Sequence, residues 1–118
     1  WKKGIDTDPP NVVNKKKSFK AALYSGVTIG MGGDVGVYPH GENVLEMELM
    51  VEYGMNPLDV LKAATSVNAH ALHLDDQIGA LKPGMKADIA IFSGNPATQI
   101  SDVRKVLFVM KEGVVYRE

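Results

Sequence analysis

The sequence predicts an α/β fold that is too short to be a complete barrel. A helical pattern leads through a tight turn into an apolar run at residues 27–31 and then into a glycine-rich, acidic loop. Beyond residue 75 the helical pattern gives way to strand-like segments. The chain has 118 residues, whereas an eight-stranded α/β barrel needs about 250. Because it also begins at Trp1 without an initiator methionine, we expect a fragment with an α/β part at 1–75 and a β part at 76–118.

The first expected unit is a helix followed by a buried strand. Asn14 can cap a helix over residues 15–24, and Gly26 can end it. The β-branched start and apolar character of residues 27–31 favour a strand of a parallel sheet that is covered on both faces. A helix, a turn and a buried strand in this order form one step of a barrel or of a doubly wound sheet.

Three short helices are expected in the middle of the chain, where a plain barrel would alternate helices with strands. Residues 42–53 have a wide apolar face opposite their glutamates, and Gly54 can serve as the C-terminal cap. Asn56 followed by Pro57 indicates the start of a second helix. A third, shorter helix is expected from residue 66 or 68 to about residue 74.

The C-terminal part is predicted to consist of strands. Residues 88–92 form an apolar run, and a turn-forming segment at 93–96 follows it. Residues 103–110 and 114–116 flank a Lys-Glu-Gly segment, which predicts a hairpin with glycine at its tip.

Composition excludes several classes of function. A formal net charge of −1 argues against nucleic-acid binding, which requires a strongly basic surface. The basic run at residues 15–17 is interpreted as a solvated helix face. No apolar stretch approaches the roughly 18 residues of a membrane span, so we expect no membrane partner. The chain lacks cysteine, which is compatible with a reducing, cytoplasmic location.

Asp34 is the main candidate for a catalytic residue. It lies in the loop at residues 30–41, which reads Gly-Met-Gly-Gly-Asp-Val-Gly-Val-Tyr-Pro-His-Gly and follows the predicted strand directly. Active sites of α/β barrels are built at the carboxyl ends of the strands. The alternative is an aspartate that satisfies its own backbone within a turn.

Four segments in the same order resemble the C-terminal third of metal-dependent amidohydrolases, specifically the imidazolonepropionase-like and prolidase-like group. The resemblance covers about residues 15–118. The segments are Gly33-Asp34, Tyr-Pro-His-Gly-Glu-Asn at 38–43, Ala-Thr-Ser-Val-Asn-Ala at 64–69, and Ile-Gly-Ala-Leu-Lys-Pro-Gly-Met-Lys-Ala-Asp at 78–88.

This resemblance implies the C-terminal portion of a (β/α)8 TIM-like barrel, followed by strands of a small β-sandwich at 78–118. Asp34 matches the aspartate that ends the eighth barrel strand. It would lie beside one or two zinc ions, as a ligand, and would accept a proton from the hydrolytic water. The family's other metal ligands come from earlier strands and have no counterpart here. Asp88 is interpreted as structural, bonding to backbone groups at a turn.

The implied reaction is hydrolysis of a C–N bond in a dipeptide, in another peptide-like substrate or in a cyclic amide. His40 and Tyr38 could contact the substrate at the mouth of the site; the alternative is that both are ordinary loop residues. His70 and His73 have a spacing that could bind a metal, but packing or surface roles are favoured. The fragment alone is expected to be inactive.

Two other functions are compatible with the sequence. The chain could be a non-catalytic module that folds only as a homo-oligomer or with the missing barrel half, because unpaired strand edges invite pairing. A phosphate-binding loop at residues 30–36 ranks last, because it lacks the lysine and the glycine order of known phosphate-binding motifs.

Overall fold

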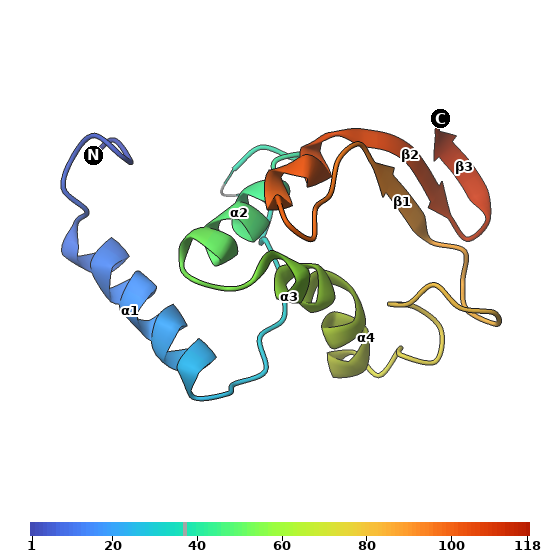
Figure 1. Ribbon diagram of the computed structural model, residues 1–118, viewed down its shortest axis with the longest axis horizontal. Coiled ribbons are helices and arrows are strands. Elements are labelled where there is room, and N and C mark those ends of the chain that lie inside the picture. The colour runs from blue at the N-terminus through green and yellow to red at the C-terminus, as the bar shows by residue number, and fades with distance from the viewer. Residues whose placement is uncertain (37) are drawn as a thin grey trace.

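The computed structural model describes residues 1–36 and 38–118. It is a small α/β structure with α1 at one end, the sheet at the other, and the remaining helices between them (Figure 1). The elements are α1 (Pro10–Tyr24), α2 (Val44–Glu52), α3 (Pro57–Lys62), the π-helical turn η1 (Ala63–Val67), α4 (Asn68–Ala71), β1 (Ile89–Phe92), the 3₁₀ helix η2 (Ile100–Arg104), β2 (Val106–Lys111) and β3 (Val114–Arg117).

Helix α1 begins five residues before the predicted start. Pro9 is the N-cap residue with extended backbone angles, and Pro10 occupies the first turn. Proline suits this position because its φ is already helical and its missing N–H has no intrahelical partner there. Asn14 therefore lies inside the helix and does not cap it, so that prediction was wrong. The predicted end at Tyr24 is confirmed.

The predicted strand at residues 27–31 is not formed in the part of the chain that the structure describes. A strand requires a second backbone to complete its hydrogen bonds. Here the Met31 N–H lies 3.4 Å from the carbonyl oxygen of Ala63 and 3.2 Å from Oδ1 of Asn68. The segment thus contacts a helical region and a side chain where a barrel would supply a neighbouring strand.

The helical region between the two ends follows the local signals closely. Gly54 ends α2 with a φ of 110°, and its N–H donates to the Val51 carbonyl at 2.9 Å. Asn56 caps α3 by accepting the Leu58 N–H at 2.9 Å. The expected third helix is not separate, because α3 continues through the π-helical turn into α4.

The sheet has three antiparallel strands in the order β1-β2-β3. The hairpin is confirmed, with Glu112 and Gly113 both at positive φ (49° and 80°) at its tip. Strand β2 starts later than predicted, because residues 103 and 104 belong to η2. The Asp88 carboxylate accepts the Glu112 N–H at 2.7 Å. Its predicted structural role at a turn is confirmed.

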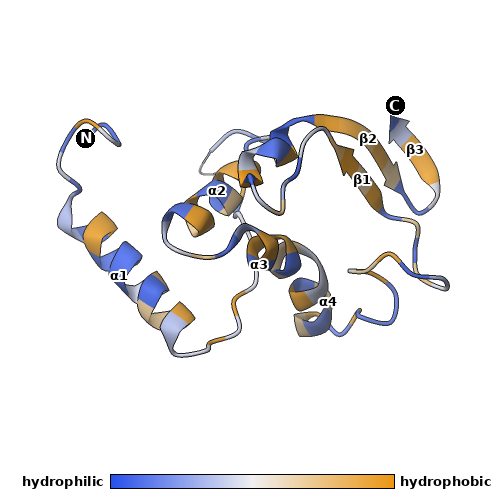
Figure 2. Cartoon of the chain, viewed as in Figure 1, coloured by the Kyte–Doolittle hydropathy of each residue, from blue (hydrophilic) through white to orange (hydrophobic). Residues whose placement is uncertain are grey.

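The buried core joins α2, α3, η1 and η2. Met47, Met50, Val60, Ala63 and Ile100 form it, with partly buried neighbours that include two residues of the 27–31 segment. Figure 2 shows apolar stretches, in orange, on α2 and α3. The segment that leads to Asp34 is therefore packed against the core.

Among the described residues, no helix combines the length and apolar content needed to cross a bilayer.

Candidate functional site

Asp34 lies at the end of the segment that leaves the core. Its φ is 48°, in the left-handed region that aspartate and asparagine tolerate better than other non-glycine residues. The residue is exposed. An exposed carboxylate on a constrained backbone can reach a substrate or a metal ion that is held by other residues, and the catalytic role of Asp34 stays a prediction.

Asn68 holds this segment from α4. Its Oδ1 accepts the Met31 N–H at 3.2 Å, and its Nδ2 donates to the Met31 carbonyl at 2.6 Å. The side-chain amide thus pairs with the backbone as a neighbouring strand would. A Cβ on Gly30 would come within 2.3 Å of the Asn68 Oδ1. Glycine at position 30 therefore permits the close approach.

Glu46 holds the next residues from the first turn of α2. Its Oε1 accepts the Gly32 N–H at 3.2 Å. Its Oε2 is buried and has no hydrogen-bond partner among the described residues. A Cβ on Gly33 would lie 3.2 Å from this oxygen. The carboxylate therefore fits tightly against the two glycines that precede Asp34.

Tyr38 closes the loop on its other side. Its hydroxyl donates to the Gly33 carbonyl, and a Cβ on Gly33 would be only 2.2 Å from that hydroxyl oxygen. His40 is exposed in the turn that follows. The structure thus places Tyr38 beside Asp34's neighbour and His40 further along the loop. Substrate contacts of Tyr38 and His40 stay predictions.

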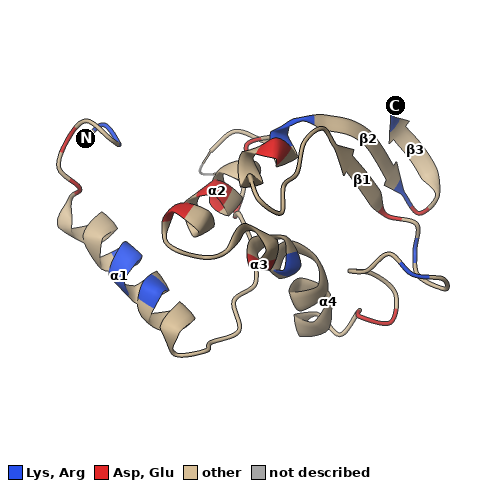
Figure 3. Ribbon diagram, viewed as in Figure 1, with Lys and Arg blue, Asp and Glu red and all other residues tan. Residues whose placement is uncertain are grey.

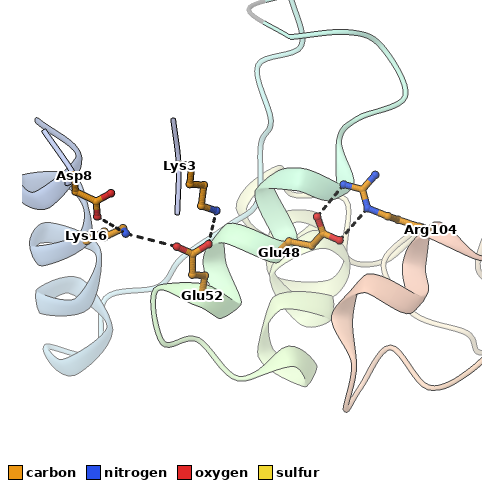
Figure 4. Close-up of polar contacts among 6 residues, drawn as sticks. All are labelled: Lys3, Asp8, Lys16, Glu48, Glu52 and Arg104. Carbon is orange, nitrogen blue, oxygen red and sulfur yellow. Dashed lines mark hydrogen bonds and ion pairs between the residues drawn. The ribbon is translucent and has the colours of Figure 1, made fainter. Parts of the chain in front are cut away.

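Arg104 fixes the far end of the loop. Its guanidinium pairs with both oxygens of Glu48, Nε to Oε1 at 2.9 Å and Nη2 to Oε2 at 2.8 Å, and Nη1 reaches Glu42 at 2.9 Å. Figure 4 shows the paired geometry with Glu48. Hydrogen bonding to Arg104 lowers the pKa of Glu48 to about 2, and the same contact raises the pKa of Arg104. η2 is thereby tied to α2 and to the loop that contains His40.

A second group of ion pairs connects α1 and the N-terminal segment to α2. Figure 3 shows basic residues on α1 and acidic residues on α2. Lys16 lies 2.6 Å from the Asp8 carboxylate and 3.6 Å from that of Glu52, which also pairs with Lys3. The hydrogen bond to Asp8 raises the pKa of Lys16. The central lysine of the basic run is thus paired within the chain.

The described residues do not form a metal site by themselves. Within residues 1–36 and 38–118, no three His, Cys, Asp or Glu side chains are grouped closely enough to hold a metal ion. The His70 ring lies 3.3 Å from the Asp75 carboxylate, and this contact lowers the pKa of Asp75. The side chains of both residues are exposed, in agreement with a surface role for His70. Asp34 could supply one carboxylate to a centre completed by other residues.

Sequence reasoning missed Asn68 and Glu46 as parts of this site. The sequence predicts Asn68 as a possible helix start and as part of the 64–69 segment of the resemblance, and it predicts Glu46 on the polar face of a helix, but it assigns neither residue to the Asp34 loop. One signal for Asn68 is its place in the segment Ala-Thr-Ser-Val-Asn-Ala at 64–69, where it has the longest polar side chain among small residues. The sequence carried no comparable signal for Glu46, whose pattern matches that of its exposed neighbours.

The chain belongs to the amidohydrolase family, whose profile matches residues 11–116. It is 32% identical over 85 residues to the imidazolonepropionase of Geobacillus kaustophilus, an alignment that covers 70% of this chain and 20% of that protein. It is 48% identical over 46 residues to the imidazolonepropionase of Geobacillus thermodenitrificans, covering 39% of this chain and 11% of the relative.

The structure is also similar to that of a Xaa-Pro dipeptidase solved with methionine in its active site. The TM-score is 0.84 at 33% identity, covering 97% of this chain and 30% of the dipeptidase chain. Together these similarities place the chain in the imidazolonepropionase-like and prolidase-like branch. They also show that it spans less than a third of the proteins it matches here.

Proposed function

We propose that this chain is the C-terminal part of a hydrolase that cleaves a C–N bond in a peptide-like or cyclic amide substrate. The observation that carries the proposal is the position of Asp34. Its exposed carboxylate follows a glycine segment that Asn68 and Glu46 hold against the core. The similarity of the chain to a Xaa-Pro dipeptidase and to imidazolonepropionases supports this class of substrate.

In this proposal Asp34 is both a metal ligand and the proton acceptor. A divalent metal ion, when bound, lowers the pKa of a coordinated water toward about 7. A carboxylate next to that water can accept its proton and later return it to the leaving amine. A single exposed carboxylate fits as one ligand of a shared centre but not as a complete centre. We therefore place the remaining ligands, for one or two zinc ions, in the part of the barrel outside this chain.

The same proposal assigns residues 1–75 to the barrel and residues 76–118 to the smaller β domain. Tyr38 and His40 would then border the substrate, with the Tyr38 hydroxyl also closing the loop at Gly33. By itself the chain would lack most of the substrate pocket. We expect no turnover until it is combined with the rest of the barrel.

The test is the substitution Asp34→Asn in the complete polypeptide that carries this segment. Asparagine tolerates the positive φ of residue 34, so the backbone should be preserved. Loss of a general acid–base group costs about 10²- to 10⁴-fold in rate, and we expect kcat to fall by that much. Asp76→Asn, an exposed aspartate outside the loop, is the matched control and should leave kcat unchanged.

Three readouts are needed: kcat on a set of Xaa-Pro dipeptides and cyclic amides, zinc content, and the thermal unfolding midpoint. Turnover by Asp34→Asn close to that of the unmodified protein would disprove the assigned role. If instead the unmodified protein turned over none of these compounds, the substrate class would be wrong.

A second proposal concerns association. The described apolar surface includes Val27, Leu72 and Leu81, which are 55%, 65% and 77% exposed. The chain could therefore act as a non-catalytic module that is stable only as a homo-oligomer or with the missing barrel half. The oligomeric state of the isolated chain distinguishes this alternative.

A further inference from the structure

The two carboxylate oxygens of Glu46 lie in different environments. Oε1 accepts the Gly32 N–H at 3.2 Å. Oε2 is buried without a hydrogen-bond partner among the described residues. Burying an unpaired polar atom is unfavourable, and such atoms in native proteins call for an explanation. A glutamate on a solvated helix face would expose both carboxylate oxygens, whereas Oε2 of Glu46 is buried.

The carboxylate is directed at the backbone that precedes the candidate catalytic residue. The Gly32 N–H donates to Oε1, and a Cβ on Gly33 would lie 3.2 Å from Oε2. The helix that carries Glu46 is held in place by the core, because Met47 and Met50 of α2 are 7% and 4% exposed and belong to that core. Glu46 can therefore restrain the loop relative to the packed interior.

We propose that Glu46 is a positioning residue for Asp34. It fixes the backbone of Gly32 and Gly33 from α2, so that the Asp34 side chain leaves the loop in one direction. The function of Glu46 in this inference is that of a hydrogen-bond acceptor, and its charge is not required. The inference rests on the proposed role of Asp34, but the restraint on the loop can be measured without any assay of activity.

The experiment compares Glu46→Ala and Glu46→Gln in the complete polypeptide loaded with zinc. Glutamine keeps an acceptor for the Gly32 N–H, whereas alanine removes it. Hydrogen–deuterium exchange measured by mass spectrometry on peptides covering residues 30–36 reports on the restraint. We expect Glu46→Ala to exchange there at least about fivefold faster, and Glu46→Gln to exchange at the unmodified rate.

Activity provides the second readout. Misplacing a catalytic group lowers the rate of the chemical step, so we expect Glu46→Ala to lower kcat at least tenfold with little change in KM. Glu46→Gln should retain most of kcat and the unmodified pH profile. Glu52→Ala is the matched control, because Glu52 lies on the same helix but pairs with Lys3 and Lys16. Circular dichroism establishes that each variant is folded.

The possible outcomes separate this inference from the proposed function. Unchanged exchange at residues 30–36 in Glu46→Ala would overturn the inference, whatever the activity. An equal loss of kcat in both Glu46 variants, with exchange normal in Glu46→Gln, would also overturn it, because the carboxylate would then act chemically. Failure of the proposed function alone would appear as normal kcat in Asp34→Asn together with the expected exchange pattern for Glu46.

Discussion

At the scale of single residues, the loop at residues 30–43 is held by side chains that come from three helical elements. Asn68 binds Met31, Glu46 binds Gly32, and Arg104 of η2 binds Glu42. Each contact uses a directional hydrogen bond on backbone or carboxylate. Such contacts fix orientation as well as distance, as the proposed role of Asp34 requires.

The Arg104 contact predicts a pH dependence of stability. The pKa of Glu48 falls from 4.5 to about 2 in the folded protein because of the hydrogen bond to Arg104. A carboxylate with a lowered folded pKa contributes stability above its unfolded pKa and loses it as pH falls through the folded pKa. Arg104→Met should therefore lower the unfolding midpoint at pH 7, and the difference from the unmodified protein should shrink between pH 4.5 and about 2.

Urea denaturation of the complete polypeptide at pH 7, pH 4 and pH 3 measures this difference. Comparing the two proteins at each pH cancels the titration of carboxylates that they share. Lys62→Met is the control, because among the described residues Lys62 pairs with Asp59 alone, at an exposed i,i+3 position, and its loss should leave the midpoint nearly unchanged. The prediction would be contradicted if the difference in unfolding midpoint between Arg104→Met and the unmodified protein did not vary with pH.

At the scale of elements, Gly94 and the carboxylate of Asp102 shape the turn that connects β1 to η2. Gly94 has a φ of 92°, and Asp102 is 8% exposed. The Asp102 Oδ2 accepts the Asn95 N–H at 2.9 Å, and its Oδ1 pairs with Lys105 at 2.7 Å. The hydrogen bond from Lys105 lowers the pKa of Asp102. The turn is thus closed around a buried aspartate.

Gly94→Ala should disrupt this turn. The new Cβ would lie 2.2 Å from the Asp102 Oδ2, so the carboxylate must move or the backbone must shift. Gly84→Ala is the matched control, since Gly84 has a similar φ of 89° but, apart from its chain neighbours, none of the described residues has an atom within 4 Å of an added Cβ.

Left-handed strain alone costs about 1–2 kcal/mol, and we expect that loss of unfolding free energy in Gly84→Ala. The steric conflict should add about 1–3 kcal/mol in Gly94→Ala. Urea denaturation measures both. Equal losses of unfolding free energy in the two variants would contradict the prediction, because the Asp102 carboxylate would then move aside without destabilising the fold.

At the scale of the whole molecule, the chain is more open than a self-contained domain. Its radius of gyration is 15.8 Å, whereas a compact domain of this length has about 13.5 Å. Helix α1, all of whose residues are described, buries none of them. Tyr24 at its end and Tyr116 in β3 are 89% and 71% exposed. Apolar side chains on both ends of the molecule are therefore available to other parts of a larger fold.

This openness predicts that the isolated chain associates. Exposed apolar surface promotes contact between copies, so we expect light scattering after size-exclusion chromatography to show dimers or larger species at tens of micromolar. Co-expression with the remainder of the proposed barrel should replace these species by one complex of equal stoichiometry. A monomer with a single cooperative thermal transition would show that the chain is stable without a partner.

Several features of the fold could be predicted because they depend on neighbouring residues. Asn56 and Pro57 start α3, and Gly54 follows the end of α2, through effects on the nearest backbone groups. The turn at Glu112 and Gly113 is local in the same sense. The sequence alone also marked Asp34 as the candidate catalytic residue, through its place after an apolar segment.

The tertiary structure alone decided how that residue is held. Met31 and Asn68 are 37 positions apart, and Gly32 and Glu46 are 14 apart, so no local pattern relates them. The 27–31 segment is apolar enough for a strand, yet it forms none here because strand formation depends on a partner backbone. Local sequence determined which elements could form, whereas packing between distant segments determined which side chains support the Asp34 loop.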